Sequence, residues 1–272
     1  IGNAVRDAQS MRFTFRYPDQ DFKLKTGDSV ILADSLKSIN GLVIDEENQS
    51  VSFKITDASL IQTGHTDIAA SRTINTDVLV AGLFRYAEEV IRQTKKYPAI
   101  DAILMRLPPS IKGHTEGKPL TTDRATVKEV SAVVASMNSS YLFIQGPPGA
   151  GKTYTGSRVI LDLLKAGKRV GVTSNSHKAI VNLLHAIEKE ALATSFKFKG
   201  IKKSSKDSEL DQVRGELIKD VYDTRSFLAS NAQLISGTAW AMADPHLDKT
   251  LDYLFVDEAG QVSLGHLIPA AT

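Results

Sequence analysis

The first quarter of the chain alternates apolar and polar residues in short runs. Apolar side chains occupy every second position at residues 13–17 and 51–55, and apolar runs at 29–33 and 41–45 lie between them. This period of two is typical of strands with one buried face. We expect residues 1–75 to form a small antiparallel β-barrel. Such barrels bind oligonucleotides in some proteins and are structural modules in others, so the pattern assigns no role.

The pattern changes to a helical period over residues 76–120. Apolar residues recur at steps of three and four between residues 78 and 91, with charged residues between them. This spacing predicts an amphipathic helix, which we expect Pro98 to end. A second helix is expected at residues 99–107. The glycines and proline of residues 112–122 indicate a linker, so the region is predicted to be a helical stalk with a linker.

Residues 121–272 alternate short apolar runs with helical stretches. The apolar runs lie at residues 141–145, 169–173, 233–237 and 253–257. Buried strands separated by helices are typical of a parallel sheet with helices on its faces. We therefore expect an α/β domain in this part of the chain.

A glycine-rich segment follows the expected strand at residues 141–145. It reads Gly-Pro-Pro-Gly-Ala-Gly-Lys-Thr and matches the pattern of a phosphate-binding loop, or Walker A motif, in full. Its glycines let backbone N–H groups surround phosphate oxygens, and the expected helix after it contributes its N-terminal dipole. A plain glycine-rich turn is the alternative. The expected nucleotide-binding residues are Gly146, Pro147, Pro148, Gly149, Ala150, Gly151, Lys152, Thr153 and Tyr154.

Within this loop, two side chains have specific predicted roles. Lys152 is expected to reach the β- and γ-phosphates of ATP and to act in catalysis, and the hydroxyl of Thr153 is expected to ligate Mg²⁺.

Two carboxylates end the last expected strand. Asp257 and Glu258 follow the apolar run at residues 253–256, which is the Walker B arrangement. We expect Asp257 to hold magnesium, directly or through water, and Glu258 to orient and deprotonate the attacking water. Such a pair is also common in solvated turns, but its combination with the loop at residues 146–153 favours ATP hydrolysis.

Composition excludes several other chemistries. The 272 residues include no cysteine, which excludes disulfides, thiolate metal sites and a cysteine nucleophile. The six histidines show no ligand spacing, so no structural metal is expected. The net charge of +2 does not by itself indicate nucleic acid, and the basic run at residues 197–206 is predicted to be a solvated loop. No apolar run is long enough to cross a bilayer, so we expect a cytoplasmic protein.

Four segments together resemble motifs of superfamily 1B helicases, the Upf-like and Dna-two-like branch. Residues 145–153 and 257–261 resemble motifs I and II of that family. Residues 170–179 resemble motif Ia, and residues 234–239 resemble the next strand with its Gly-Thr turn. The resemblance is closest to bacterial helicases that are fused to a RecB-like nuclease.

The resemblance implies a P-loop RecA-like parallel sheet that follows a small barrel and a stalk. It implies an ATP-dependent, magnesium-dependent motor on single-stranded nucleic acid, with DNA favoured over RNA. Gln261 is expected to sense the γ-phosphate as part of the catalytic set. The implied nucleic-acid contacts are Ser174, Asn175, Ser176, His177, Lys178 and Thr238. Helix capping by Ser174 or Ser176 is the alternative for that segment. For Trp240, core packing is the alternative to stacking on a base.

The sequence departs from the family pattern at two places. The glutamine that reads adenine in the family falls near Glu129, and no glutamine lies between residues 121 and 141. The family's Gly-Asp-x-x-Gln motif and second RecA-like domain are not found before Thr272. Because the chain also begins at Ile1, we expect the N-terminal portion of a larger helicase, to which a nuclease domain could be fused. ATP turnover is expected of that larger protein, whereas this portion alone is expected to bind nucleotide weakly and to hydrolyse it poorly. Two alternatives stay open: a switch or assembly ATPase without nucleic acid, and a binding module without catalysis.

Overall fold

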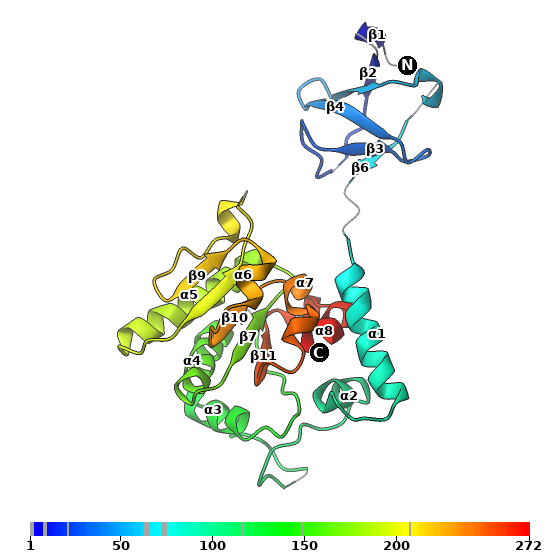
Figure 1. The fold of residues 1–272 in the computed structure, drawn as a ribbon. Helices are drawn as coiled ribbons and strands as arrows, with labels where there is room; N and C mark the ends of the chain where they lie inside the picture. The colour runs from blue at the N-terminus through cyan, green and yellow to red at the C-terminus, as the bar shows by residue number, and fades with distance from the viewer. Residues whose placement is uncertain are drawn as a thin grey trace. The chain divides into compact units, whose positions relative to one another are not determined.

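The structure is a computed structural model. It describes residues 3–7, 10–20, 22–61, 66–71, 75–115, 117–147, 149–206 and 208–272. The chain divides into two compact units, Ile1–Asn75 and Thr76–Thr272 (Figure 1). None of the helices in these described ranges is long and apolar enough to cross a membrane.

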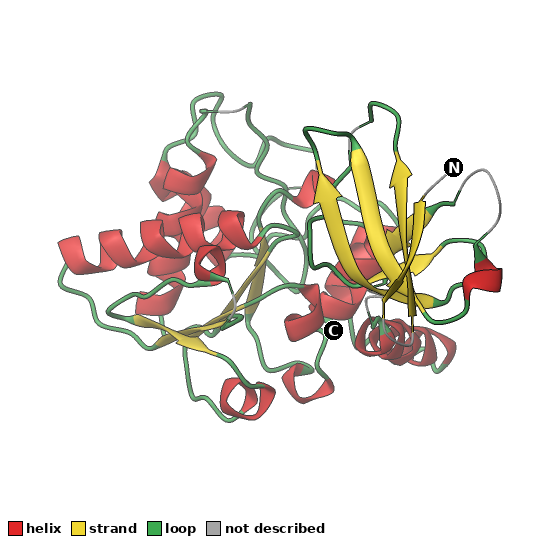
Figure 2. Cartoon of the chain, turned by 90° about the horizontal axis from the view of Figure 1, so that it is seen from above, coloured by secondary structure: helices red, strands yellow, loops and turns green. Residues whose placement is uncertain are grey.

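The first unit is a six-stranded antiparallel sheet (Figure 2, yellow strands beside the N label). Its strands are β1 (Asn3–Asp7), β2 (Ser10–Arg16), β3 (Val30–Leu32), β4 (Ser38–Asp45), β5 (Ser50–Ile55) and β6 (Ile68–Ala70). They pair in the order β1-β2-β5-β4-β3-β6, and the short 3₁₀ helix η1 (Ala58–Leu60) follows β5. The strands expected from alternation, β2 and β5, and from the apolar runs between them, β3 and β4, are confirmed. In the described part of the unit, β1 and β6 lie at the two edges of this antiparallel sheet and do not pair with each other. A closed barrel therefore stays a prediction.

The core of the first unit lies on one face of this sheet. Phe15 stacks on Phe13 and on Phe53, with ring centroids 6.3 Å and 5.7 Å apart. The register of β4 against β5 shifts between Asn40 and Val43, which marks a bulge in the sheet. The buried core residues are Val30, Leu32, Ile39, Leu42, Phe53 and Ile55.

The second unit contains a five-stranded parallel sheet. Its strands are β7 (Val170–Thr173), β8 (Gly200–Lys203), β9 (Ile218–Val221), β10 (Leu234–Ser236) and β11 (Tyr253–Val256). The strand order is β11-β7-β10-β8-β9, and every described pair is parallel. All carboxyl ends therefore meet at one edge of the sheet. The sequence predicted β7, β10 and β11, which are confirmed, whereas β8 and β9 were missed.

Helices cover both faces of the parallel sheet (Figure 1). One face packs against α3 (Val127–Ala135), α4 (Lys152–Lys165) and α5 (His177–Ala193). The other face packs against α1 (Asp77–Ile91), α6 (Thr224–Leu228), α7 (Ala239–Met242) and α8 (Leu264–Ala271). Alternation along β10 explains the two cores, because Leu234 belongs to the first and Ile235 to the second. The remaining helices are α2 (Pro98–Leu104) and the 3₁₀ helices η2 (Glu209–Asp211), η3 (Pro245–Leu247) and η4 (Ala259–Gln261).

The helical region ends differently from the sequence prediction. Helix α1 ends at Ile91 rather than at Pro98, and Gln93 and Lys95 beyond it have φ values of 55° and 54°. These left-handed conformations are incompatible with continued helix. Pro98 instead begins α2, where proline is favourable because a first-turn N–H has no partner within the helix. Helix α2 ends at Leu104 rather than at residue 107.

The predicted strand at residues 141–145 is wrong. The structure assigns these residues no strand, and Phe143 is 70% exposed. The hydroxyl of Tyr141 donates to the carbonyl of Leu107 at 2.6 Å, which holds the start of the segment to the end of the helical region. A strand needs a neighbour for its backbone hydrogen bonds, and none pairs with this segment in the described part of the chain. The apolar pattern alone was therefore insufficient.

The predicted solvated loop at residues 197–206 is also wrong. The run contains β8, and Lys202 within it has no exposed surface. A lysine can be buried when its ammonium is paired, and Lys202 pairs with Asp211, nine residues further on. Charge pattern could not reveal this pairing, because it depends on the turn that brings Asp211 back to β8.

Candidate functional site

The glycine-rich loop runs directly into α4. Gly149 and Gly151 have φ values of 78° and 81°, a region that side-chain-bearing residues rarely adopt. Gly151 is the N-cap of α4, and Lys152 is the first residue of the helix. The N–H of Ala150 donates to the carbonyl of Pro147 at 3.1 Å, which closes the turn. A tight turn before a helix N-terminus is an arrangement that favours a phosphate.

The side chain of Lys152 folds back over this loop. Its Nζ donates to the carbonyls of Gly146 at 2.7 Å and Pro147 at 3.0 Å. Thr153 is exposed in the first turn of α4. The ammonium and the hydroxyl expected at the phosphates therefore both lie at the start of the helix. Pro148, also expected to line the nucleotide, lies outside the described residues.

Tyr154 is the aromatic residue beside the loop. Its ring is 57% exposed and lies under the guanidinium of Arg158, 3.5 Å from Cζ to the ring centroid. Arg158 in turn pairs with Glu190 of α5 at 2.7 Å. These two contacts fix the ring orientation and tie the first turn of α4 to the neighbouring helix.

Asp257 and Glu258 follow the end of β11. The N–H of Asp257 donates to the carbonyl of Thr173 at 2.9 Å, which continues the parallel pairing with β7. Oδ1 of Asp257 accepts the N–H of Glu258 at 3.0 Å. Glu258 is exposed and has a φ of 51°, a left-handed conformation that costs about 1–2 kcal/mol for a residue with a side chain. Backbone strain of this kind is frequent at functional sites.

A side-chain contact joins the segments that follow β7 and β11. Nδ2 of Asn175 donates to the backbone carbonyl of Gln261. The N–H of Gln261 donates to the carbonyl of Glu258 at 2.8 Å. The segment expected to contact nucleic acid therefore touches the segment expected to sense the γ-phosphate. The sequence did not predict this contact, because the two residues are far apart in the chain and each was assigned to a separate motif.

The serines after β7 have structural partners. The hydroxyl of Ser176 accepts the N–H of Ala179 at 3.3 Å and caps α5, so the capping interpretation is confirmed for Ser176. Ser174 is buried, and its hydroxyl accepts the N–H of Ser176 at 3.3 Å. Capping does not exclude a phosphate contact by the same hydroxyl.

The other expected nucleic-acid residues lie at the same edge of the sheet. His177 and Lys178 are exposed at the start of α5, after β7. Thr238 is half-buried at the N-cap of α7, after β10, the neighbour of β7 in the sheet. Trp240 packs half-buried against the second core, with its ring centroid 4.9 Å from that of His266. This position favours core packing over base stacking for Trp240.

Within the described ranges, the structure does not connect the phosphate-binding loop to the carboxylate pair. In the part of the chain that is described, no hydrogen bond or ion pair links residues 146–153 to Asp257 or Glu258. Shared magnesium ligation by Thr153 and Asp257 thus stays a prediction.

Glu129, at the family's adenine-reading position, has a structural role. Its carboxylate accepts the N–H of Thr126 at 2.7 Å while its own N–H donates to the Thr126 hydroxyl at 3.3 Å, which forms a capping box at the start of α3. The carboxylate also accepts the hydroxyl of Thr122 at 2.9 Å. The hydrogen bonds that the carboxylate accepts, that of the Thr126 N–H above all, lower the pKa of Glu129.

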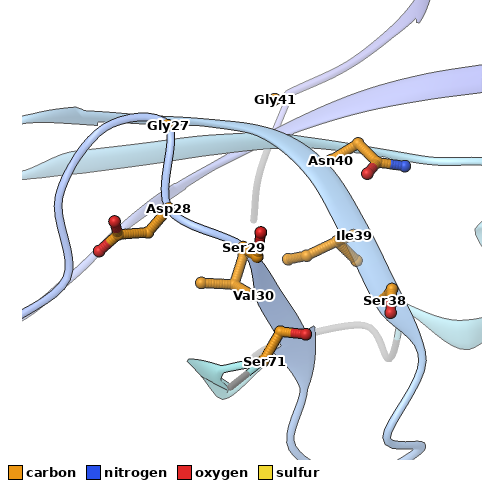
Figure 3. A pocket seen from close by; sticks show the side chains of 9 residues that line it. All are labelled: Gly27, Asp28, Ser29, Val30, Ser38, Ile39, Asn40, Gly41 and Ser71. Carbon is orange, nitrogen blue, oxygen red and sulfur yellow. The ribbon is translucent and has the colours of Figure 1, made fainter. Parts of the chain in front are cut away.

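Two hollows are described in the first unit. The smaller, of about 240 Å³, has one charged side chain, Asp28, whose carboxylate already accepts the N–H of Lys25 at 2.8 Å (Figure 3). The larger, of about 880 Å³, includes the aromatic residues Phe15, Tyr17 and Phe22. Neither contains a residue expected in catalysis, so neither bears on the nucleotide site.

Comparison with known proteins returned no match: neither a protein-family model nor a curated protein matches this chain. The likeness to superfamily 1B helicases therefore depends on the sequence motifs alone.

Proposed function

We propose that the second unit is the ATP-binding part of a nucleic-acid-dependent ATPase of the superfamily 1B helicase type, built on a P-loop RecA-like sheet. The observation that carries this proposal is the parallel pairing of β11 with β7. It brings the carboxylate pair and the Asn175 segment to one edge of one sheet, where Asn175 binds Gln261. Carboxylates at the end of β11, next to the polar segment that follows its neighbour β7, are what ATP hydrolysis coupled to nucleic-acid binding requires.

The nucleotide would lie against the loop at residues 146–153 and the N-terminus of α4. Lys152 would exchange its two backbone carbonyl partners for the β- and γ-phosphates. Tyr154, held by Arg158, is a candidate to contact the nucleotide. The left-handed glycines support this role, because such conformations are typical of the backbone turns that hold an anion with their N–H groups.

The donor set fits Mg²⁺, which prefers oxygen ligands. Thr153 offers a hydroxyl, and Asp257 offers Oδ2, which accepts no hydrogen bond within the described ranges. When bound, the ion would neutralise charge on the transferred phosphoryl group. Glu258 would orient and deprotonate the attacking water, and Gln261 would sense the γ-phosphate.

The edge that binds nucleic acid would consist of the polar segment after β7, exposed at Asn175, His177 and Lys178, and the Gly-Thr turn after β10. We propose single-stranded DNA rather than RNA as the substrate. The residues in contact would be Asn175, Ser176, His177, Lys178 and Thr238, whereas Ser174 is buried and would support the segment through its hydrogen bond with the N–H of Ser176.

Stimulation of ATP hydrolysis tests this function. The full chain is assayed with ATP and Mg²⁺, with and without single-stranded DNA, beside Glu258→Gln and the control Lys128→Ala, an exposed lysine on α3. We expect DNA to raise the rate in the wild type and in Lys128→Ala, and Glu258→Gln to abolish turnover while keeping nucleotide binding. A hydrolysis rate that neither single-stranded DNA nor single-stranded RNA changes would refute a nucleic-acid motor and would favour a switch or assembly ATPase.

A further inference from the structure

A buried network of charged side chains links β8 and η2 to the first residue of α5. Lys202 has no exposed surface and Asp211 is 4% exposed. Nζ of Lys202 donates to the carboxylate of Asp211 and, at 2.6 Å, to its backbone carbonyl. The proposed hydrolysis uses neither residue, although both lie near the carboxyl edge of the sheet.

The network is well supplied with hydrogen bonds. Ser204 accepts from Lys202 at 3.1 Å and donates to Asp220 at 2.6 Å. The second carboxylate oxygen of Asp211 accepts the N–H of Ser205 at 2.6 Å. Burial of a charged pair costs solvation that such hydrogen bonds offset only in part. A hydrophobic pair could hold η2 against β8 equally well. Stability alone therefore does not explain the charges of Lys202 and Asp211.

His177, at the start of α5, joins this network with an exposed ring. Its Nδ1 contacts the Asp211 oxygen that also binds Lys202, and its side chain is 46% exposed while that of Asp211 is 5% exposed. A carboxylate at Nδ1 selects the tautomer with the proton on that nitrogen. Nε2 makes no hydrogen bond within the described residues.

We propose that Asp211, neutralised by Lys202, is a positioning residue that directs Nε2 of His177 at a phosphate of the bound strand. The inference rests on the proposed function, because it requires nucleic acid at this edge. With both ring nitrogens protonated, Nε2–H donates a charge-assisted hydrogen bond to a phosphate oxygen. Among the described residues, the ring pairs with Asp211 on η2, which in turn pairs with Lys202 on β8, and Lys178 is the next residue of α5.

The ring tautomer tests the positioning role without nucleic acid. Nitrogen-15 chemical shifts of the histidine rings are measured in the labelled full chain, and the spectrum of His177→Gln assigns the signal. We expect neutral His177 to carry its proton on Nδ1. The paired variant Lys202→Met/Asp211→Asn, which leaves no lone buried charge, should transfer the proton to Nε2. A wild-type ring with its proton on Nε2 overturns the inference, whether or not the paired variant folds.

Affinity for a fluorescent oligothymidylate tests the phosphate contact. His177→Gln should weaken binding about tenfold, the loss expected for one charge-assisted hydrogen bond. The paired variant should lose a similar factor, and adding His177→Gln to it should cause no further loss. His246→Gln is the matched control, because His246 is also exposed and pairs with an aspartate, Asp244, but in η3 before β11.

The outcomes separate this inference from the proposed function. Wild-type binding that His177→Gln leaves unchanged overturns the inference alone. The same holds if the paired variant folds, as judged by thermal unfolding, and binds as tightly as the wild type. A wild-type chain that binds no single strand overturns the phosphate contact and the proposed function together.

Discussion

Two glycine substitutions in and beside the phosphate-binding loop should change stability in opposite directions. A Cβ at Gly151 would meet no atom within 4 Å, so Gly151→Ala adds no clash. Its φ of 81° nevertheless imposes a left-handed conformation on alanine, which costs about 1–2 kcal/mol. Gly156 lies inside α4, where a Cβ would make only an ordinary contact with Leu183 at 3.9 Å. Gly156→Ala should therefore stabilise by about 0.5–1 kcal/mol, the difference in helix propensity.

Urea unfolding measures both variants. The chain has a single tryptophan, Trp240, which packs in the second unit and so reports the unfolding of that unit alone. The two variants should differ by about 2 kcal/mol, or about thirtyfold in the unfolding equilibrium constant. Equal stability of the two, or a more stable Gly151→Ala, would refute the left-handed geometry of the loop.

Three further predictions concern capping and ionisation. Ser176→Ala should destabilise the second unit by about 1 kcal/mol in the same urea assay, because α5 loses its cap. Folding lowers the pKa of Glu129 below its ordinary value of 4.5, so its ionised form stabilises the folded state. In thermal melts, the wild type should be more stable than Glu129→Gln above pH 4.5. This advantage should disappear as the pH falls through the folded pKa. Burial, and then the hydrogen bond to Asp101, raise the pKa of Tyr86 to about 12, so its ultraviolet titration should lag behind the ordinary value of 10. The stability linked to its protonated hydroxyl should be complete below pH 10 and decline above it, and Tyr86→Phe should remove that decline.

The sequence predicted the elements whose signals are local. The glycines of the loop, the helix after it and the carboxylates after β11 each follow from a short run of residues, and α4 begins at the loop as expected. In the first unit, alternation likewise predicted β2 and β5, and the apolar runs between them predicted β3 and β4, since each signal lies within a few residues.

The features that the sequence did not predict depend on partners outside their own segment. Residues 141–145 are apolar enough for a strand but pair with no neighbour among the described strands. The burial of Lys202 follows from its pairing with Asp211, and the contact of Asn175 with Gln261 joins two motifs that were interpreted separately. Period and charge pattern describe one segment at a time, so they cannot supply such pairings.

The central claim is that the loop at residues 146–153 binds nucleotide phosphate. Its most direct test is the affinity of the full chain for a fluorescent ATP analogue with Mg²⁺, compared among the wild type, Lys152→Ala and Lys128→Ala. Lys152 lies at the loop, and Lys128 is an exposed lysine on α3. We expect Lys152→Ala to weaken binding at least about tenfold, because a charge-assisted contact to phosphate is lost, and Lys128→Ala to bind as the wild type does. Equal affinity of all three proteins, or no binding by any, would contradict the account.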